Sequence, residues 1–369
     1  MPKRRVPTLG QLNPGDPLLI QSLGKAGPKR PLPRLSADEI AQVSRTVRRV
    51  PEVVVKVSGG GGDAGSVRAH VSYIDRHGKL PIETDVGDAS PDKDAARELI
   101  SDWNLDTLPN RSRAPGETGS GTSAAEPPRR RPKAVHNIVL SMPAKVPPET
   151  VLAAARVFAR ENFALQHRYA MVLHTDTRHP HVHLVVKAER EDGTGRLNIY
   201  KATLRQWREQ FAQALREQGI EANATPAALR GRPASRLKDR IYRAQRRTQA
   251  DTSPGGPSGS SFLRQKVRSV VALLTRADRP AIDDGLPALR ASRAAVMHDW
   301  EHKASALEQQ GEAALAGSVR EFARSFPEVM TDNRRIAAAI GRAERAGRGP
   351  DNGQGQPGRA GKAPGERSR

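Results

Sequence analysis

Four of the protein's ten histidines fall within ten residues, in the stretch HTDTRHPHVH at 174–183. His181 and His183 are two residues apart, so on a β-strand both side chains would point to the same face of a sheet. His174 ends the preceding apolar stretch, and a tight hairpin would bring it beside His181. Imidazoles that converge in this way can bind a divalent transition metal and leave coordination positions open for a ligand oxygen. Asp176 is close enough in sequence to accept an N–H from one of them and fix its tautomer.

The same residues have a simpler interpretation, because histidines at the edge of a sheet are often ordinary surface residues. Their concentration in one hairpin favours a site. His179 precedes Pro180 in the turn, and we leave it out of the predicted ligands.

A tyrosine is the candidate nucleophile, because the chain has no cysteine and no evident Ser-His-Asp set. Tyr73 lies in RAHVSYIDRHGK (68–79), where several basic side chains surround it. A phenol in this setting would face an approaching phosphate. The alternative is a half-buried tyrosine on an amphipathic helix, with no chemical role.

The elements that must position these residues alternate along the middle of the chain. Residues 52–57 are rich in β-branched side chains, which predicts a buried strand. The next segment has helical spacing of Val67, Val71 and Ile74. A strand, a helix, a two-strand hairpin and a last helix closed by Gly219 follow. The expected strands are 52–57, 136–142, 167–175 and 181–188, and the expected helices are 66–76, 147–163 and 202–218. This order predicts an α+β fold with helices flanking an antiparallel β-sheet.

The composition favours a nucleic acid as the partner. The 369 residues carry 61 Lys and Arg against 40 Asp and Glu, a net charge of +21, which favours a polyanion ahead of a membrane surface. The absence of cysteine excludes a disulfide scaffold, a thiolate metal site and a cysteine nucleophile. No apolar run approaches the roughly 20 residues that span a bilayer, so we expect no membrane insertion.

The 32 glycines and 29 prolines, with only 36% hydrophobic residues, predict long stretches outside a packed core. We expect four regions. They are a basic, mostly disordered arm at 1–50 with a short helix near 37–49, a folded domain at 51–235 with a low-complexity insertion at 110–133, a basic helical region at 236–345 and a disordered tail at 346–369.

Four stretches together resemble the relaxases, the mobilization nucleases of conjugative and mobilizable plasmids and integrated elements. Relaxases are part of the His-hydrophobe-His (HUH) endonuclease superfamily. The stretches are AHVSYIDRHGKL (69–80), HNIVLSMPAKVPPE (136–149), HTDTRHPHVHLVVKA (174–188) and residues 197–225. The resemblance covers roughly residues 52–235, which would make this region a DNA-nicking domain.

The resemblance implies an enzyme that nicks one DNA strand at an origin of transfer. Tyr73 corresponds to the tyrosine that attacks the scissile phosphate and leaves a 5′-phosphotyrosyl link. His174, His181 and His183 match the ligands of a divalent ion, Mg²⁺ or Mn²⁺, that stabilises the phosphoryl charge. Asp176 matches the acidic position of the histidine motif, as an orienting group or as a base.

Further residues are expected to contact DNA. Ser141 falls in the second relaxase motif, which contacts DNA near the nick. Arg68, Arg76, Arg230 and Arg232 are predicted phosphate contacts. Tyr200 and Trp207 could stack on a base, but the spacing of Trp207 with Leu204, Phe211 and Leu215 favours the core face of a helix.

The resemblance also implies partners: single-stranded DNA at the origin of transfer, accessory relaxosome proteins and a type IV coupling protein. Such a protein would be cytoplasmic in a bacterium and could be exported attached to its DNA. Two alternatives remain open. One is a rolling-circle replication initiator or transposase of the same superfamily, less favoured because the first motif has one suitable tyrosine. The other is a non-catalytic basic DNA-binding protein that binds no metal.

Overall fold

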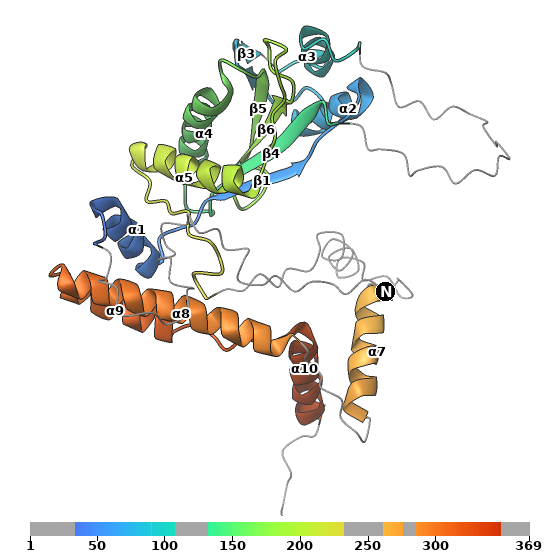
Figure 1. Cartoon of the computed structure of the whole chain (residues 1–369). Coiled ribbons are helices and arrows are strands. Elements are labelled where there is room, and N and C mark those ends of the chain that lie inside the picture. The colour runs from blue at the N-terminus through green and yellow to red at the C-terminus, as the bar shows by residue number, and fades with distance from the viewer. Residues whose placement is uncertain (1–33, 90, 108–131, 232–260, 276–284, 348–369) are drawn as a thin grey trace, which may run out of the picture. The chain divides into compact units, whose positions relative to one another are not determined.

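The computed structural model describes residues 34–89, 91–107, 132–231, 261–275 and 285–347, and Figure 1 shows their helices and strands. Most of the expected arm, insertion and tail, the start of the expected helical region (236–260) and Arg232 lie outside the described residues. The elements of the N-terminal part are α1 (Ala37–Val47), β1 (Val54–Gly59), α2 (Ala64–Ile74), β2 (Ile82–Thr84), β3 (Gly87–Ala89), α3 (Ala95–Asp102), β4 (Val135–Ser141), α4 (Pro148–Phe163), β5 (Tyr169–His174), β6 (His181–Lys187) and α5 (Lys201–Glu217). The later helices are α7 (Ser261–Thr275), α8 (Leu286–Gln309), α9 (Ala313–Arg324) and α10 (Asp332–Gly347).

A six-stranded antiparallel sheet, ordered β1-β4-β6-β5-β2-β3, organises the fold and confirms the α+β prediction (Figure 1). On one face, α4 and α5 cover an apolar layer that includes Phe158 and Phe211, both fully buried. On the other face, α2 and α3 cover a second layer that includes Val67 and Trp103. Side chains alternate between these layers along each strand.

Each expected strand and helix of the middle region is present within a few residues of its predicted limits, and Trp207 is 3% exposed, as its helical spacing predicted. One prediction about burial is wrong. Residues 52–57 were expected to form a buried strand, but β1 is an edge strand with only one face buried. Val55 is 2% exposed, whereas Val54, on the other face, is 47% exposed. A β-branched run does not distinguish a central strand from an edge strand.

The described residues up to Gly231, together with Met297–Phe326, form one compact unit, and α7, the first part of α8 and α10 belong to a second. In the first unit, α1 packs on the segment after α5 through the buried Thr46, whose hydroxyl is 2.7 Å from that of Thr225. Trp300 of α8 donates from Nε1 to the Leu229 carbonyl at 2.8 Å. The folded contacts of this unit therefore include α1, which lies in the segment expected as a basic arm.

A half-buried ion pair joins Arg230, in the segment after α5, to Glu52 just before β1, and it leads to a pH-dependent prediction. Glu52 is 17% exposed at its side chain, lies 3.3 Å from Arg230 Nε and accepts from Asn223 Nδ2 at 3.2 Å. Burial raises the pKa of the Glu52 carboxyl to about 7, although Arg230 opposes the shift. The folded state therefore binds more protons than the unfolded state between pH 4.5 and 7, and Glu52 lowers stability as the pH rises through this window.

We expect Glu52→Gln to stabilise the protein relative to wild type at pH 8, by roughly 1–3 kcal/mol, and to have little effect at pH 4.5. Urea unfolding of both proteins at pH 4.5, 6 and 8 measures the difference. Glu221→Gln, which removes an exposed carboxylate paired with Arg48, should show no such pH trend. A Glu52→Gln difference that is constant with pH would contradict the assignment.

Candidate metal and nucleophile site

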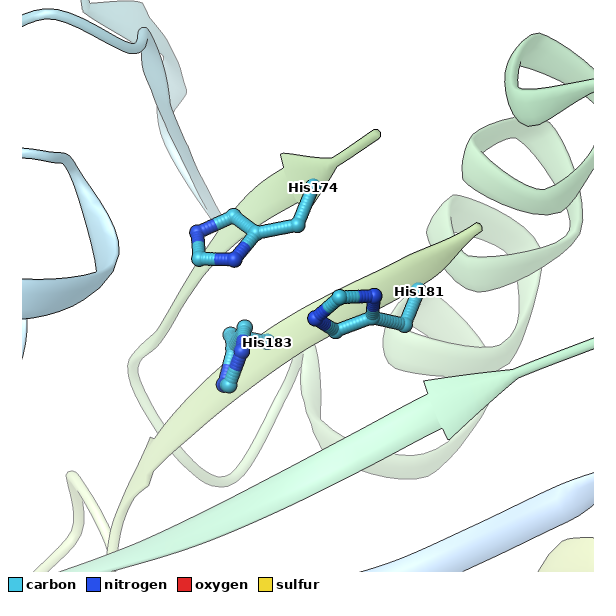
Figure 2. A group of neighbouring side chains, drawn as sticks. All are labelled: His174, His181 and His183. Carbon is cyan, nitrogen blue, oxygen red and sulfur yellow. The ribbon is translucent and has the colours of Figure 1, made fainter. Parts of the chain in front are cut away.

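Three histidines from two adjacent strands converge at one end of the sheet (Figure 2). His174 ends β5 and is paired in register with His181, the first residue of β6. His183 follows two residues later on the same face. The ring centroids are 4.5 Å apart for His174 and His183, and 5.1 Å apart for His181 and each of the other two. One ring nitrogen from each residue lies within 4.8 Å of the others.

The hairpin that brings the rings together is held by hydrogen bonds to its own backbone. Ser141, paired in register with His181, donates from Oγ to the Pro180 carbonyl at 3.1 Å. Thr177 donates from Oγ1 to the His179 carbonyl at 3.0 Å. These bonds fix residues 175–180 as a compact turn. The three histidines therefore converge as strand alternation predicted. Ser141 lies beside His181, on the neighbouring strand β4.

Backbone carbonyls select the tautomer of two of the three imidazoles. His174 Nε2 lies 2.5 Å from the Ile74 carbonyl, and His181 Nδ1 lies 3.0 Å from the His179 carbonyl. Because a carbonyl oxygen only accepts, both nitrogens must carry the proton. The free lone pairs are then on His174 Nδ1 and His181 Nε2.

The electrostatic setting keeps two of the rings neutral. Burial lowers the pKa of His174, and burial together with the neighbouring His174 and His181 lowers the pKa of His183 to about 3. Neutral imidazoles with fixed tautomers fit a divalent cation. Three nitrogen donors suit a transition metal better than Mg²⁺, which prefers an all-oxygen set.

Tyr73 lies on α2 at the border of this site. The helix begins at a capping box between Asp63 and Ser66, and it buries Val67, Val71 and Ile74 against the sheet, as their spacing predicted. Tyr73 faces away from that layer and is 58% exposed. The next residue, Ile74, gives the carbonyl that holds His174, so the backbone beside the tyrosine is tied directly to the histidine cluster.

Arg76 connects the tyrosine with the histidines. Its guanidinium carbon lies 5.2 Å from the centre of the Tyr73 ring, and Nη2 donates to His174 Nδ1 at 3.2 Å. The same Nη2 donates to Asp176 in a short ion pair. Arg76 and the following residue, His77, have φ angles of 57° and 58°, a conformation unusual for residues other than glycine. The left-handed turn after α2 thus aims Arg76 back at the site.

The other predicted residues are distributed over the first unit. Asp176 is exposed and pairs with Arg76, where the sequence suggested a histidine as its partner. Arg68 is exposed on α2. Arg230 pairs with Glu52 and donates to the Thr225 carbonyl at 3.1 Å, so it holds the fold together. Tyr200 is 68% exposed at the start of α5.

The sequence analysis missed two residues that share this face. Lys56 of β1 pairs with Val139 of β4, which pairs with His183, so the exposed lysine is two strands from the histidines in the same row. His70 of α2 has its ring centroid 6.3 Å from that of His183. The position of His70, three residues before Tyr73, was the only signal in the sequence.

No helix in the described ranges is both long and apolar enough to span a membrane.

Comparisons with known proteins agree with the resemblance seen in the motifs. Residues 114–220 match the family described as relaxase, MobA/VirD2-like, nuclease domain. The chain is 25% identical over 212 residues to the T-DNA border endonuclease VirD2 of Agrobacterium fabrum, covering 54% of this chain and 45% of that protein. It is 25% identical over 193 residues to VirD2 of Rhizobium radiobacter, covering 49% and 43%. The chain spans less than half the length of these curated relatives.

A solved structure, the MobM relaxase domain bound to origin-of-transfer DNA and Mn, covers 51% of this chain and 94% of its own at 13% identity. Its TM-score of 0.32 is too low to carry a structural conclusion. The sequence matches relate residues of this chain to a relaxase nuclease domain and to DNA endonucleases, in agreement with the resemblance predicted from the motifs.

Proposed function

We propose that this protein, which carries a relaxase-type nuclease segment, nicks single-stranded DNA at an origin of transfer by attack of Tyr73 on the scissile phosphate. The observation that carries the proposal is the link between Tyr73 and the histidine cluster. Ile74 and Arg76, one and three residues after Tyr73, both contact His174. A tyrosine on a helix that is tied to a cluster of three imidazoles supports a proposal of phosphoryl transfer.

The step is a transesterification. The Tyr73 hydroxyl oxygen bonds to phosphorus while the bond from phosphorus to the 3′-oxygen breaks, and the proton lost by the phenol is balanced by one gained by the 3′-oxygen. The products are a 5′-phosphotyrosyl link and a free 3′-hydroxyl. One ester bond replaces another, so the reverse step rejoins the strand without an external energy source. A divalent ion held by His174, His181 and His183 supplies charge stabilisation at the phosphoryl oxygens.

The remaining residues bind and orient. The hydrogen bond from Arg76 lowers the pKa of Asp176, which makes this carboxylate a weak proton acceptor. We therefore assign Asp176 to hold Arg76, and Arg76 to meet the phosphate beside Tyr73. Ser141 and Arg68 extend the contact with the strand. Arg230 and Arg232 remain proposed phosphate contacts.

In this proposal the protein acts in conjugative transfer or mobilization of a plasmid or integrated element. It would work in the bacterial cytoplasm with accessory relaxosome proteins and a type IV coupling protein, and it would leave the cell attached to its DNA. The proposed regions are the nicking domain at 51–235 with its insertion at 110–133, the basic arm at 1–50, the helical region at 236–345 and the tail at 346–369. Of the two expected ions we prefer Mn²⁺, because a site of three nitrogen donors suits a transition metal better than Mg²⁺, which prefers oxygen ligands.

A covalent-adduct assay tests the proposal. Purified full-length protein is incubated with Mn²⁺ and labelled single-stranded DNA tiled across the region that flanks its own gene. A denaturing gel should then show a protein band that carries DNA, and a chelator should remove it. If no DNA gives an adduct although the protein binds a full equivalent of Mn²⁺, the nicking proposal is overturned. Absence of both adduct and bound metal would identify a non-catalytic DNA-binding protein.

Arg76 gives a prediction that separates metal binding from nicking. Its guanidinium donates to His174 Nδ1, the nitrogen whose lone pair is needed for an ion, so it must move when metal binds. We expect Arg76→Asn, which tolerates the positive φ, to bind Mn²⁺ roughly 3–10-fold more tightly, because a cation next to the site is removed. At saturating Mn²⁺, the adduct should form about tenfold more slowly, because a phosphate contact is lost.

Calorimetric titration with Mn²⁺ and a time course of adduct formation measure these two effects. Arg97→Gln, which breaks an exposed ion pair with Asp94 on α3, is the matched control and should change neither. Weaker Mn²⁺ binding by Arg76→Asn would show that the guanidinium supports the ligand set instead of competing with the ion.

A further inference from the structure

His70, on helix α2, packs against His183 of the histidine cluster. It is half-buried and lies one helical turn before Tyr73. Its ring meets that of His183 edge to face, with 6.3 Å between centroids and 68° between planes. Neither the family match, which begins at residue 114, nor the motifs give this residue a role.

Each of the two rings in this contact has one buried nitrogen that lacks a partner in the described part of the chain. His70 Nε2 and His183 Nδ1 are both buried, and neither has a hydrogen-bond partner among the described residues. A buried polar atom without a partner is costly, and most such atoms in native proteins are satisfied by protein or by an ordered water. Here one nitrogen donating and the other accepting would satisfy both atoms at once.

His183 is also the histidine of the three for which no carbonyl in the described residues selects a tautomer. His174 is set by the Ile74 carbonyl and His181 by the His179 carbonyl. Metal-binding histidines almost always donate their second ring N–H to an oriented acceptor, and the loss of that acceptor weakens binding. The ring that packs against His183 belongs to His70, and its Nε2 is the nitrogen without a partner in the described residues.

We propose that His70 is a positioning residue for the metal site. It accepts the Nδ1–H of His183, directly or through one bridging water, and so leaves His183 Nε2 free to ligate. The ring centroids are 6.3 Å apart, so the two rings are close enough for a small side-chain rotation or one water to join them. This proposal rests on the proposed metal site, but it concerns metal binding alone and makes no claim about nicking.

The consequence is a second connection between the nucleophile's helix and the metal ligands. Ile74 holds His174 from the end of α2, and His70 holds His183 from one turn earlier. The helix that carries Tyr73 therefore orients two of the three ligands. A shift of α2 on the sheet would change the position of the tyrosine and the ligand geometry together.

Two substitutions test the role. His70→Leu keeps the volume and removes the acceptor, whereas His70→Gln keeps an acceptor near the position of Nε2. We expect His70→Leu to bind Mn²⁺ about 10–100-fold more weakly than wild type, and His70→Gln to recover most of that loss. Calorimetric titration of the full-length protein with Mn²⁺ measures both. His77→Asn, which removes an exposed histidine at the end of the same helix, should bind as wild type does.

A spectrum of the Co²⁺-loaded proteins distinguishes positioning from ligation. At saturating Co²⁺, the visible bands of His70→Leu should match those of wild type, because the ligand set is unchanged. Altered bands would make His70 a fourth ligand and overturn the proposal, and so would an unchanged affinity of His70→Leu. Because the titrations use no DNA, this result is independent of the nicking assay.

Discussion

Tyr73→Phe should abolish the covalent protein–DNA adduct, while Mn²⁺ binding and DNA binding stay near wild-type levels. The substitution removes one oxygen, the atom that bonds to phosphorus, and keeps the ring that Arg76 contacts at 5.2 Å. Because Tyr73 is 58% exposed, the change leaves no cavity in the core. We expect adduct formation to fall by at least about a thousandfold, since the chemical step has lost its nucleophile.

The assay is the denaturing gel with labelled DNA, with metal and DNA binding measured separately on the same preparation. Tyr169→Phe is the matched control. Tyr169 is 7% exposed, and it begins the strand that His174 ends, so it lies at the opposite end of β5 from the site. An adduct that persists in Tyr73→Phe would assign the nucleophile to another residue and would leave the metal site in place.

Removal of a metal ligand is the second large effect. We expect His181→Ala to lose Mn²⁺ affinity by more than about a hundredfold, because loss of a mere orienting partner already costs 10–100-fold. Nicking should fall to the level seen with chelator. Binding of single-stranded DNA should remain, because the chain carries a net charge of +21 and the proposed phosphate contacts are arginines that do not depend on the metal.

His181 is the suitable ligand to replace, because it is half-buried at the start of β6, whereas His174 is 1% exposed. Thermal unfolding of His181→Ala and of the control His77→Asn would show that both remain folded. Retention of both metal and nicking in His181→Ala would remove the cluster from the proposed chemistry. Loss of DNA binding along with the metal would instead show that the ion itself holds the strand.

Local patterns in the sequence predicted the histidine cluster because strand alternation and a short hairpin need no long-range information. His181 and His183 share a face by period, and the register with His174 follows from a six-residue turn. The same holds for the core face of α5, where Trp207 and Phe211 are buried as their spacing indicated. Such features depend on residues close in the chain.

The contacts that complete the site depend on residues far apart in the chain. Arg76 and Asp176 are 100 residues apart, and their pairing follows from the packing of α2 on the sheet. The direction of the Arg76 side chain follows from a left-handed turn at Arg76 and His77. Neither residue is a glycine, so the sequence did not indicate this turn. Arg230 was expected to contact DNA because it is basic. Its ion pair with Glu52, 178 residues away in the chain, is visible only in the structure.

The shortest elements also escaped prediction. Strands β2 and β3 have three residues each, too few to show alternation, and α3 has eight. They extend the sheet past β5 and complete the layer under α2.

The pairing of β6 with its neighbours also provides a measure of correct assembly. Val182 and Leu184 point into the layer under α4 and α5, while His181 and His183 point to the opposite face. A slip of β6 by one residue would exchange these faces, bury two imidazoles in an apolar layer and leave no ligand set. In a refolded preparation, the fraction of chains that takes up Mn²⁺ therefore counts the molecules whose central strands have found their register, before any DNA is added.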